Sequence, residues 1–270
     1  MMRLFLPPDS RGVMPVMYFH AMARLGVEGA VIVSPRDTFV SVGYFDHVPT
    51  IIDQDYCARQ GITVCRRETG GGAVLLGPGQ TFYQLVLPKR HPWLRGTLEA
   101  RYRFLSRIPV AAYRSLGVET RYAPVNDLIT LDGRKVAGQG AADIGACFCW
   151  VGNLLGTFDV DAMCRVLRFP DPGVGEKVRQ AMDRHMSWVA RERGEPPSRV
   201  QRESVLREAF DSLLGPLEPH PMPEEVTRLA YDLAKRFTSR ACLGKETARI
   251  HRATKIREGV YVPWGETCKS

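Results

Sequence analysis

Short apolar runs recur along the chain, and glycine, proline or charged residues bound each of them, as is typical of β-strands. The runs predict strands over residues 30–34, 38–42, 62–65, 81–87, 127–131, 135–138 and 146–155. Asp132-Gly133 lies between two of these runs and predicts a hairpin turn there. The strand pattern therefore covers the first 155 residues and becomes sparse afterwards.

Other segments carry apolar residues at helical spacing. They predict helices over residues 16–25, 53–60, 97–116, 161–167, 175–193, 200–214 and 223–237. Thr97 is the expected N-cap of the third helix, and Pro109 is expected to kink or split it. Because strands and helices mix without regular βαβ alternation, we predict an α+β fold.

The chain has 270 residues, enough for one large domain with a small appendage. A proline-rich stretch over residues 215–223 is expected to be a linker. We therefore predict a catalytic domain over residues 1–215 and a short, helical C-terminal extension over residues 216–270. The tail after Gly244 is basic and polar, and we expect it to be partly irregular.

Composition narrows the class of protein. With 44% hydrophobic and 24% charged residues, the chain should be globular, and no apolar run approaches the roughly 20 residues that span a bilayer. Seven scattered cysteines and no secretory signal predict reduced thiols in the cytoplasm. The net charge of +8 favours an acidic protein partner or anionic small molecules, and we expect neither nucleic-acid nor membrane binding.

Two clusters suggest chemistry. Arg66 and Arg67 precede Gly70-Gly71-Gly72. Such a segment can bring backbone N–H and guanidinium groups to an anion. A glycine-rich hairpin with two solvated arginines fits the pattern equally well. Lys135 lies in an apolar strand, within reach of Asp127 across the predicted hairpin. A lysine there needs an anionic partner if it is buried, and is otherwise an exposed strand residue.

Together, four motifs resemble the biotin/lipoate protein ligase family in order and spacing, most closely its lipoate–protein ligases. They are Gly43-Tyr44-Phe45, residues 66–74, Asn126-Asp127-Leu128 and residues 134–138. The likeness covers roughly residues 30–185. It implies the class II ligase catalytic domain, in which a mixed β-sheet with flanking helices surrounds the ligand.

The resemblance implies an ATP-dependent lipoate–protein ligase. Such enzymes use ATP and Mg²⁺ to convert lipoate to lipoyl-adenylate, and then pass the acyl group to a lysine of an acidic carrier, a lipoyl domain or a glycine-cleavage H-like protein. Lys135 is the implied catalytic lysine, and Asp127 either orients it or ligates Mg²⁺. The implied substrate- and nucleotide-binding residues are Arg67, Gly70, Gly71, Gly72, Val74, Leu76, Asn126, Gly138, Gly43 and Tyr44. Val42, Tyr44, Val74 and Leu75 are expected to form the acyl slot.

Some features depart from the family pattern. Leu76 stands in a segment where these ligases commonly carry His and Asp, and Trp150 lies in a strand that commonly carries a histidine. The two side chains either pack against each other or alter the acyl slot.

About fifty residues follow the predicted linker, too few for the accessory domain that some members carry. A separate accessory subunit, a pre-activated substrate and a minimal ligase are the open alternatives.

Other functions fit the same fold. A cysteine-dependent octanoyl- or lipoyl-transferase would form a thioester without ATP, with Cys147, Cys149 and Cys164 as candidate nucleophiles. Because Cys147 and Cys149 are two residues apart on one strand, however, we expect them to share one face as small core residues. A non-catalytic carrier-binding homologue is a further alternative, and a biotin ligase is disfavoured because its loop is usually more polar.

Overall fold

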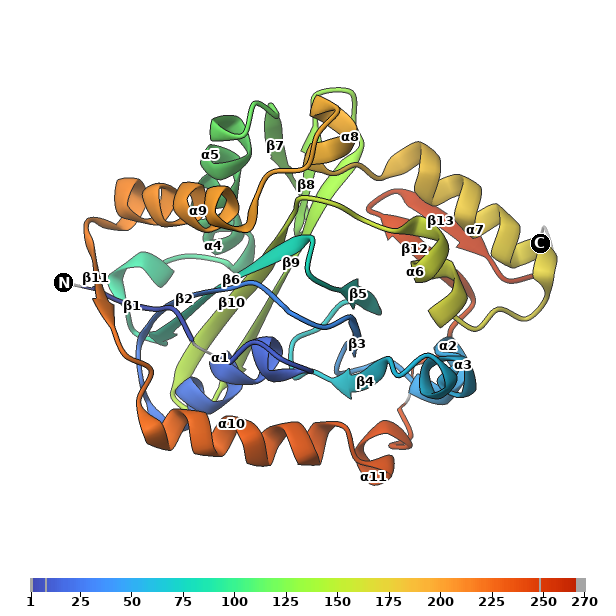
Figure 1. The fold of residues 1–270 in the computed structure, drawn as a ribbon, viewed down its shortest axis with the longest axis horizontal. Helices are drawn as coiled ribbons and strands as arrows, with labels where there is room; N and C mark the ends of the chain where they lie inside the picture. Colours follow the sequence, from blue (N-terminus) through green and yellow to red (C-terminus); the bar gives the residue numbers. More distant parts are fainter. Residues whose placement is uncertain (1, 8, 248, 266–270) are drawn as a thin grey trace.

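The computed structural model describes residues 2–7, 9–247 and 249–265 of the chain. An eight-stranded mixed β-sheet runs through its middle (Figure 1). In order across the sheet, the strands are β11 (Leu217–His220), β1 (Met2–Phe5), β2 (Gly29–Val33), β6 (Gln80–Pro88), β10 (Cys147–Leu155), β9 (Lys135–Ile144), β8 (Asp127–Thr130) and β7 (Thr120–Ala123). β1 pairs in parallel with β11 and β2, and the other neighbours are antiparallel. The predicted α+β class is confirmed.

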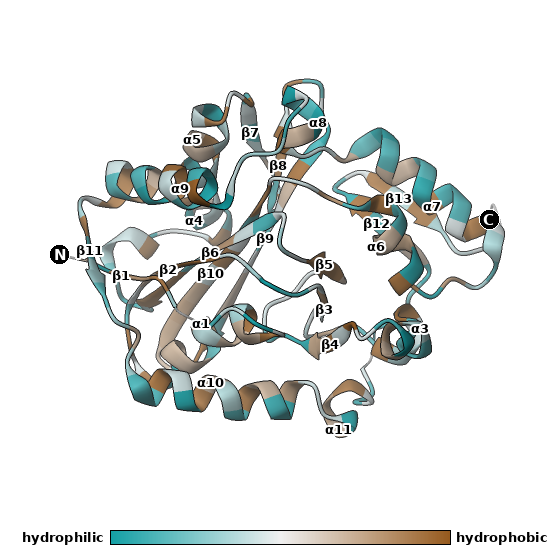
Figure 2. Cartoon of the chain, in the orientation of Figure 1, coloured by the Kyte–Doolittle hydropathy of each residue, from teal (hydrophilic) through white to brown (hydrophobic). Residues whose placement is uncertain are grey.

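Helices cover both faces of this sheet (Figure 1). One face packs against α1 (Met14–Leu25) and α10 (Glu224–Phe237), and the other against α4 (Leu98–Leu105), α5 (Arg107–Ser115) and α9 (Arg199–Leu214). Along β6, Tyr83 and Leu85 join the core under α5 and α9, whereas Phe82 and Val86 join the core under α1 and α10. This alternation follows from the two-residue period of a strand. In Figure 2, α10 carries both colours, as an amphipathic helix does.

A third core lies beside the large sheet. It is built on a three-stranded sheet in which β3 (Phe39–Val42) is central, parallel to β4 (Thr63–Arg66) and antiparallel to β5 (Val74–Leu76). The elements that pack around it are α2 (Val48–Ile51), α3 (Gln54–Arg59), α6 (Val160–Val166), α7 (Pro172–His185), and a hairpin of β12 (Ala253–Arg257) and β13 (Val260–Pro263). The remaining elements are the 3₁₀-helix η1 (Pro92–Leu94), α8 (Val189–Arg193) and α11 (Arg240–Leu243). The glycine segment therefore connects β4 to β5, where the two sheets face each other.

The predicted helix over residues 97–116 is split into two helices, as the proline at position 109 suggested. Thr97 caps α4 as expected, because its Oγ1 accepts a hydrogen bond from the Ala100 N–H at 3.2 Å. The break occurs at Ser106, between α4 and α5. Pro109 lies in the first turn of α5, where backbone N–H groups lack helical partners, so the break at Ser106 accommodates the proline.

The C-terminal third also differs from the sequence expectations. The single helix predicted over residues 175–193 is two helices, α7 and α8. The predicted linker contains β11, which completes the edge of the large sheet by pairing with β1. The tail expected to be irregular forms the β12–β13 hairpin, so the segment after residue 215 is not purely helical. The division into a catalytic domain over residues 1–215 and an extension over residues 216–270 stays a prediction. No helix in the described ranges is long and apolar enough to cross a membrane.

Candidate active site

A cavity of about 580 Å³ opens between the three-stranded sheet, the β8–β9 hairpin and the C-terminal hairpin. Its more polar walls come from residues 67–76, 126–141 and 249–264, and its apolar end comes from α6, α7 and the loops that flank them. The apolar end is lined by Phe158, Met163, Phe169, Met182 and Met186. The cavity can thus hold a ligand with one charged and one apolar part.

The glycine segment, residues 67–72, is held in shape by Arg67. Its Nη2 donates to the carbonyls of Gly70 and Gly72 at 2.9 and 2.8 Å, and its Nη1 donates to the Ser41 carbonyl at 2.7 Å. Burial lowers the pKa of Arg67 to about 10, so it is still charged at neutral pH. Arg66 is also buried, and it donates to the carbonyls of Gly43, Tyr44 and Asp46.

The arrangement of the two arginines settles one alternative. Neither side chain is solvated, so the interpretation of a glycine-rich hairpin with two solvated arginines is wrong. Both guanidinium groups therefore hold backbone carbonyls around the loop that follows β3 and around the glycine segment. Arg67 lines the cavity, and its direct contact with an anionic ligand stays a prediction.

Gly43 lies outside the cavity but allows the glycine segment to take its path. A Cβ on Gly43 would lie 1.9 Å from the Gly71 carbonyl oxygen, so only glycine fits there. Gly71 has φ of +95°, which strains any other residue. Tyr44 also lies outside the cavity: it is 40% exposed, and its N–H donates to the Thr69 carbonyl. Gly43 and Tyr44 therefore support the loop from behind.

Lys135 and Asp127 face each other in the cavity. The Lys135 Nζ lies 2.8 Å from the Asp127 Oδ1, and the carboxylate is almost fully buried. The second carboxylate oxygen, Oδ2, accepts the Glu258 N–H at 3.0 Å. The lysine side chain passes Gly138, where an added Cβ would lie 3.3 Å from Nζ. The structure thus places a charged amine at the cavity wall and fixes it from one side.

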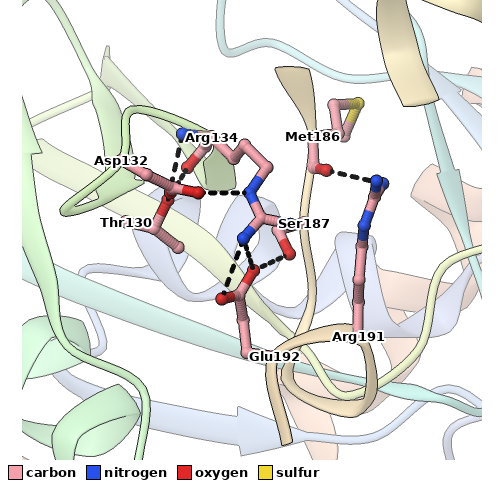
Figure 3. A network of polar contacts seen from close by, with 7 residues as sticks. All are labelled: Thr130, Asp132, Arg134, Met186, Ser187, Arg191 and Glu192. Atoms are coloured by element: carbon pink, nitrogen blue, oxygen red, sulfur yellow. Dashed lines mark hydrogen bonds and ion pairs between the residues drawn. The ribbon is translucent and has the colours of Figure 1, made fainter. Parts of the chain in front are cut away.

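The backbone of Lys135 is held by the segment between α7 and α8. The Ser187 N–H donates to the Lys135 carbonyl at 2.8 Å. Figure 3 shows the neighbouring network, in which Arg134 bridges Asp132 and Glu192. Ser187 Oγ also donates to Glu192, which joins this network to the segment that holds Lys135. These contacts join the turn of the β8–β9 hairpin to α8, and they fix the backbone of Lys135.

Asn126 and the glycines complete the predicted set. The Asn126 side chain donates to the Gln139 carbonyl, and the Gln139 N–H returns a bond to the Asn126 carbonyl at 2.9 Å. Of the predicted residues, those that line the cavity are Arg67, Gly70, Gly71, Gly72, Val74, Leu76, Asn126, Asp127, Lys135 and Gly138. Their binding and catalytic roles stay predictions.

The metal prediction depends on Asp127. Within the described residues, no group of three His, Cys, Asp or Glu side chains is arranged to hold a metal ion. Both Asp127 oxygens already accept protein donors, Lys135 Nζ and the Glu258 N–H. This geometry supports the orienting role of Asp127, and the Mg²⁺ role stays a prediction.

The predicted acyl slot is only partly at the cavity. Val74 and Leu75 line it, whereas Val42 is buried in the third core. Leu76 also lines the cavity and belongs to the core under α1, but Trp150 belongs to the core under α5 and α9. The Trp150 Nε1 donates to Gln139 Oε1 at 2.9 Å. The suggestion that Leu76 and Trp150 pack against each other is therefore wrong, because they lie in different cores.

The described cysteines lie away from the cavity. None of the six that the structure describes lines it, and Cys268 lies outside the described residues. Cys147 and Cys149 are buried in the core under α1, as the strand pattern predicts. Burial raises the pKa of Cys65 to about 12 and that of Cys164 to about 11. These thiols are protonated at neutral pH and poorly suited to nucleophilic attack.

Sequence reasoning missed several cavity residues. Asp46 is buried at the cavity and paired with Arg249, whose Nη1 lies 2.8 Å from the Asp46 Oδ1. Lys255, Tyr261 and Trp264 also line the cavity, all from the tail expected to be irregular. The sequence did contain a signal for this hairpin. Glu258-Gly259 lies between two runs of alternating apolar residues, a pattern that is typical of a β-hairpin.

The fold and site define a class of protein. Residues 19–211 match the model of the lipoyl protein ligase A/B catalytic domain, and this chain belongs to that family. The family resemblance inferred from the four motifs is therefore confirmed.

Curated relatives within this family differ in name. Octanoyltransferase LipM of Kyrpidia tusciae is 26% identical over 220 residues, covering 73% of this chain and 80% of that protein. Lipoate-protein ligase A subunit 1 of Thermoplasma acidophilum is 27% identical over 155 residues, covering 54% of this chain and 59% of that protein. A solved bi-partite lipoate protein ligase from Thermoplasma acidophilum superposes with a TM-score of 0.79 at 22% identity, covering 92% of this chain and all of that chain. That structural likeness shows the fold.

Proposed function

We propose that this protein attaches a lipoyl or octanoyl group to the side-chain amine of a lysine on a lipoyl-carrier protein, through an acyl-adenylate formed with ATP. The observation that carries the proposal is the Lys135–Asp127 pair, which lies at the cavity together with the glycine segment. Membership of the lipoyl protein ligase A/B family supports acyl transfer, and the ATP-dependent route is part of the proposal. The cysteines that the structure describes do not reach the cavity, which favours a route without a thioester on the protein.

In the first step, a carboxylate oxygen of the acid bonds to the α-phosphorus of ATP, and pyrophosphate leaves. Two anionic groups must approach each other, so a cation between them lowers the barrier. The Lys135 ammonium is the proposed cation, and Asp127 keeps it oriented toward the cavity. The backbone N–H groups of residues 70–72 are proposed to bind the phosphate.

In the second step, the neutral amine of the carrier lysine attacks the acyl carbon, and AMP leaves as the amine loses a proton. The carrier must therefore place one lysine at the cavity mouth. A lipoyl domain is the proposed partner, since the solved archaeal lipoylation system of Thermoplasma acidophilum comprises a bi-partite ligase and its E2 lipoyl domain. The net charge of +8 would favour an acidic carrier over a basic one.

A second candidate is a cysteine-dependent octanoyltransferase, and the name of the Kyrpidia tusciae relative favours it. In that reaction a thiolate would attack an octanoyl thioester, release the donor thiol, and then pass the octanoyl group to the carrier amine. The reaction needs a cysteine at the cavity. The described thiols do not supply one, so Cys268 is the residue to test.

Intact mass of a lipoyl-carrier protein separates the two functions. The carrier is incubated with the protein and one of three donors: octanoic or lipoic acid with ATP and Mg²⁺, the synthetic acyl-adenylate, or an octanoyl thioester of an acyl carrier protein. We expect the carrier to gain acyl mass with the acid and ATP, and no gain when ATP is omitted.

The other outcomes have distinct meanings. A gain only from the adenylate would assign activation to a separate accessory subunit. A gain only from the thioester, with octanoyl mass appearing on this chain and lost in Cys268→Ser, would replace the adenylate route by the transferase. No gain from any donor, with carrier binding retained, would indicate a non-catalytic carrier-binding homologue.

A further inference from the structure

The β12–β13 hairpin forms part of the cavity wall. Thr254, Lys255, Ile256 and Tyr261 all line the cavity, together with the Lys135–Asp127 pair from the β8–β9 hairpin. Figure 1 shows β12 and β13 beside α6 and α7, far in sequence from the glycine segment. The C-terminal segment therefore brings a second lysine to the cavity that contains Lys135.

Two contacts fasten this segment to carboxylates of the cavity. The Glu258 N–H, in the turn of the hairpin, donates to the Asp127 Oδ2 at 3.0 Å. Upstream of the hairpin, Arg249 pairs with the buried Asp46 at 2.8 Å. Because Asp127 also binds Lys135, the same carboxylate positions both the catalytic lysine and the hairpin turn. The position of Lys255 is thus coupled to the site.

Lys255 has a replaceable partner. Its Nζ lies 2.5 Å from the Glu258 Oε2, and the Lys255 and Glu258 side chains are 36% and 40% exposed. Exposed ion pairs of this kind contribute little, typically about 0–1 kcal/mol. By contrast, the donors of Arg67 are engaged with loop carbonyls and Ser41. A multiply charged anion in the cavity can therefore take the place of Glu258 at Lys255.

We propose that Lys255 is a second anion-binding residue of the active site, which contacts a phosphate oxygen of the nucleotide while Lys135 contacts the reacting groups. The proposal rests on the function proposed above. It means that the C-terminal hairpin supplies, within this chain, a cation for the phosphate of ATP or of the acyl-adenylate. Glu258 holds the Lys255 ammonium in place until the phosphate arrives.

Equilibrium binding of two phosphate probes, ATP and inorganic pyrophosphate, tests this proposal by calorimetry at fixed salt. The variants are Lys255→Gln, Lys255→Arg and Glu258→Gln. Lys235→Gln is the matched control, because this lysine is 82% exposed on α10, away from the cavity. We expect Lys255→Gln to raise the Kd of both probes about tenfold, the size of one charge-assisted hydrogen bond. Lys255→Arg should restore binding, and the control should bind normally.

Glu258→Gln distinguishes anion binding from a merely structural role. Removing the competing carboxylate should tighten binding of both probes, whereas a hairpin that only needs its ion pair would bind them more weakly. The backbone bond from residue 258 to Asp127 is retained in this variant. Thermal unfolding midpoints of all variants should stay close to that of the wild type.

The results separate this proposal from the proposed function. Unchanged Kd values in Lys255→Gln, or a wild-type protein that binds neither probe, would overturn the role of Lys255. If the wild type acylates the carrier with ATP while Lys255→Gln binds both probes normally, only the Lys255 proposal falls. If pyrophosphate binding depends on Lys255 but no ATP-dependent acylation occurs, the anion site stands and the ligase function falls.

Discussion

At the scale of single residues, Lys135 and Asp127 show how burial decides the role of a charge. The carboxylate is almost fully buried and has two donors, Lys135 Nζ and the Glu258 N–H. The lysine keeps part of its surface open at the cavity. Asp127 therefore has a structural role, whereas Lys135 can exchange its contact with Asp127 for a contact with a ligand.

Replacing Lys135 by alanine should abolish most acyl transfer and leave the fold intact. Loss of one preorganised donor to a charged transition state typically lowers rate about 10²–10³-fold. The free energy of unfolding should fall by about 1–3 kcal/mol, because Asp127 keeps only the Glu258 N–H. Carrier mass per unit time and chemical denaturation measure the two effects.

The exposed Lys235→Ala variant is the control and should match the wild type in both measurements. Acyl transfer by Lys135→Ala at the wild-type rate, in a correctly folded protein, would show that the catalytic assignment is wrong.

At the scale of elements, the glycine segment depends on a strand next to it. β3 ends at Val42, and the following Gly43 lies directly against the Gly71 carbonyl. Arg67 holds the segment through the carbonyls of Gly70 and Gly72. The shape of the loop is thus determined by contacts on both sides, and a change at either should alter the cavity.

Gly43→Ala should displace the glycine segment without entering the cavity itself. The added Cβ would lie 1.9 Å from the Gly71 oxygen, a distance that forces the backbone to move. We expect ATP binding to weaken at least tenfold, since even small misplacement of a binding loop is costly. Gly70→Ala, where the new Cβ meets no atom within 4 Å, should have a smaller effect. Equal ATP affinity in Gly43→Ala and wild type, measured by calorimetry, would contradict the supporting role of Gly43.

At the scale of the whole molecule, the burial of α1 between the sheet and α10 makes the stability of the protein depend on pH. His20 on α1 is fully buried, and its Nε2 accepts the Glu68 N–H at 3.0 Å, so the ring must be neutral. Burial lowers the pKa of His20 from 6.5 to about 3. Between these two pH values, His20 binds a proton in the unfolded chain but stays neutral in the folded protein. The free energy of unfolding that His20 contributes is therefore lost as the pH falls below 6.5.

Between pH 7 and pH 5, this residue should lower the free energy of unfolding by about 2 kcal/mol. Replacing His20 by glutamine, which does not titrate, should lower stability at pH 7 but reduce the further loss at pH 5 by that amount. Urea denaturation at the two pH values measures the difference. The same loss in both proteins would show that His20 is not the linked group.

Local sequence patterns were sufficient for much of this protein. Apolar alternation predicted most strands of the large sheet, and the four motifs predicted the family and the residues that line much of the cavity. These features depend on residues close together in the chain, such as Asp127 and Lys135 on the two strands of one hairpin. Their spacing alone placed them within reach of each other.

Only the tertiary structure decided what each charge contacts. Arg66 and Arg67 bind loop carbonyls, which the sequence did not indicate, and the tail expected to be irregular contributes Lys255 to the cavity. The bond between Glu258 and Asp127 joins residues 131 positions apart. Such contacts depend on the packing of the third core and not on local periodicity, because a charged side chain binds whichever partner the fold brings within hydrogen-bond distance.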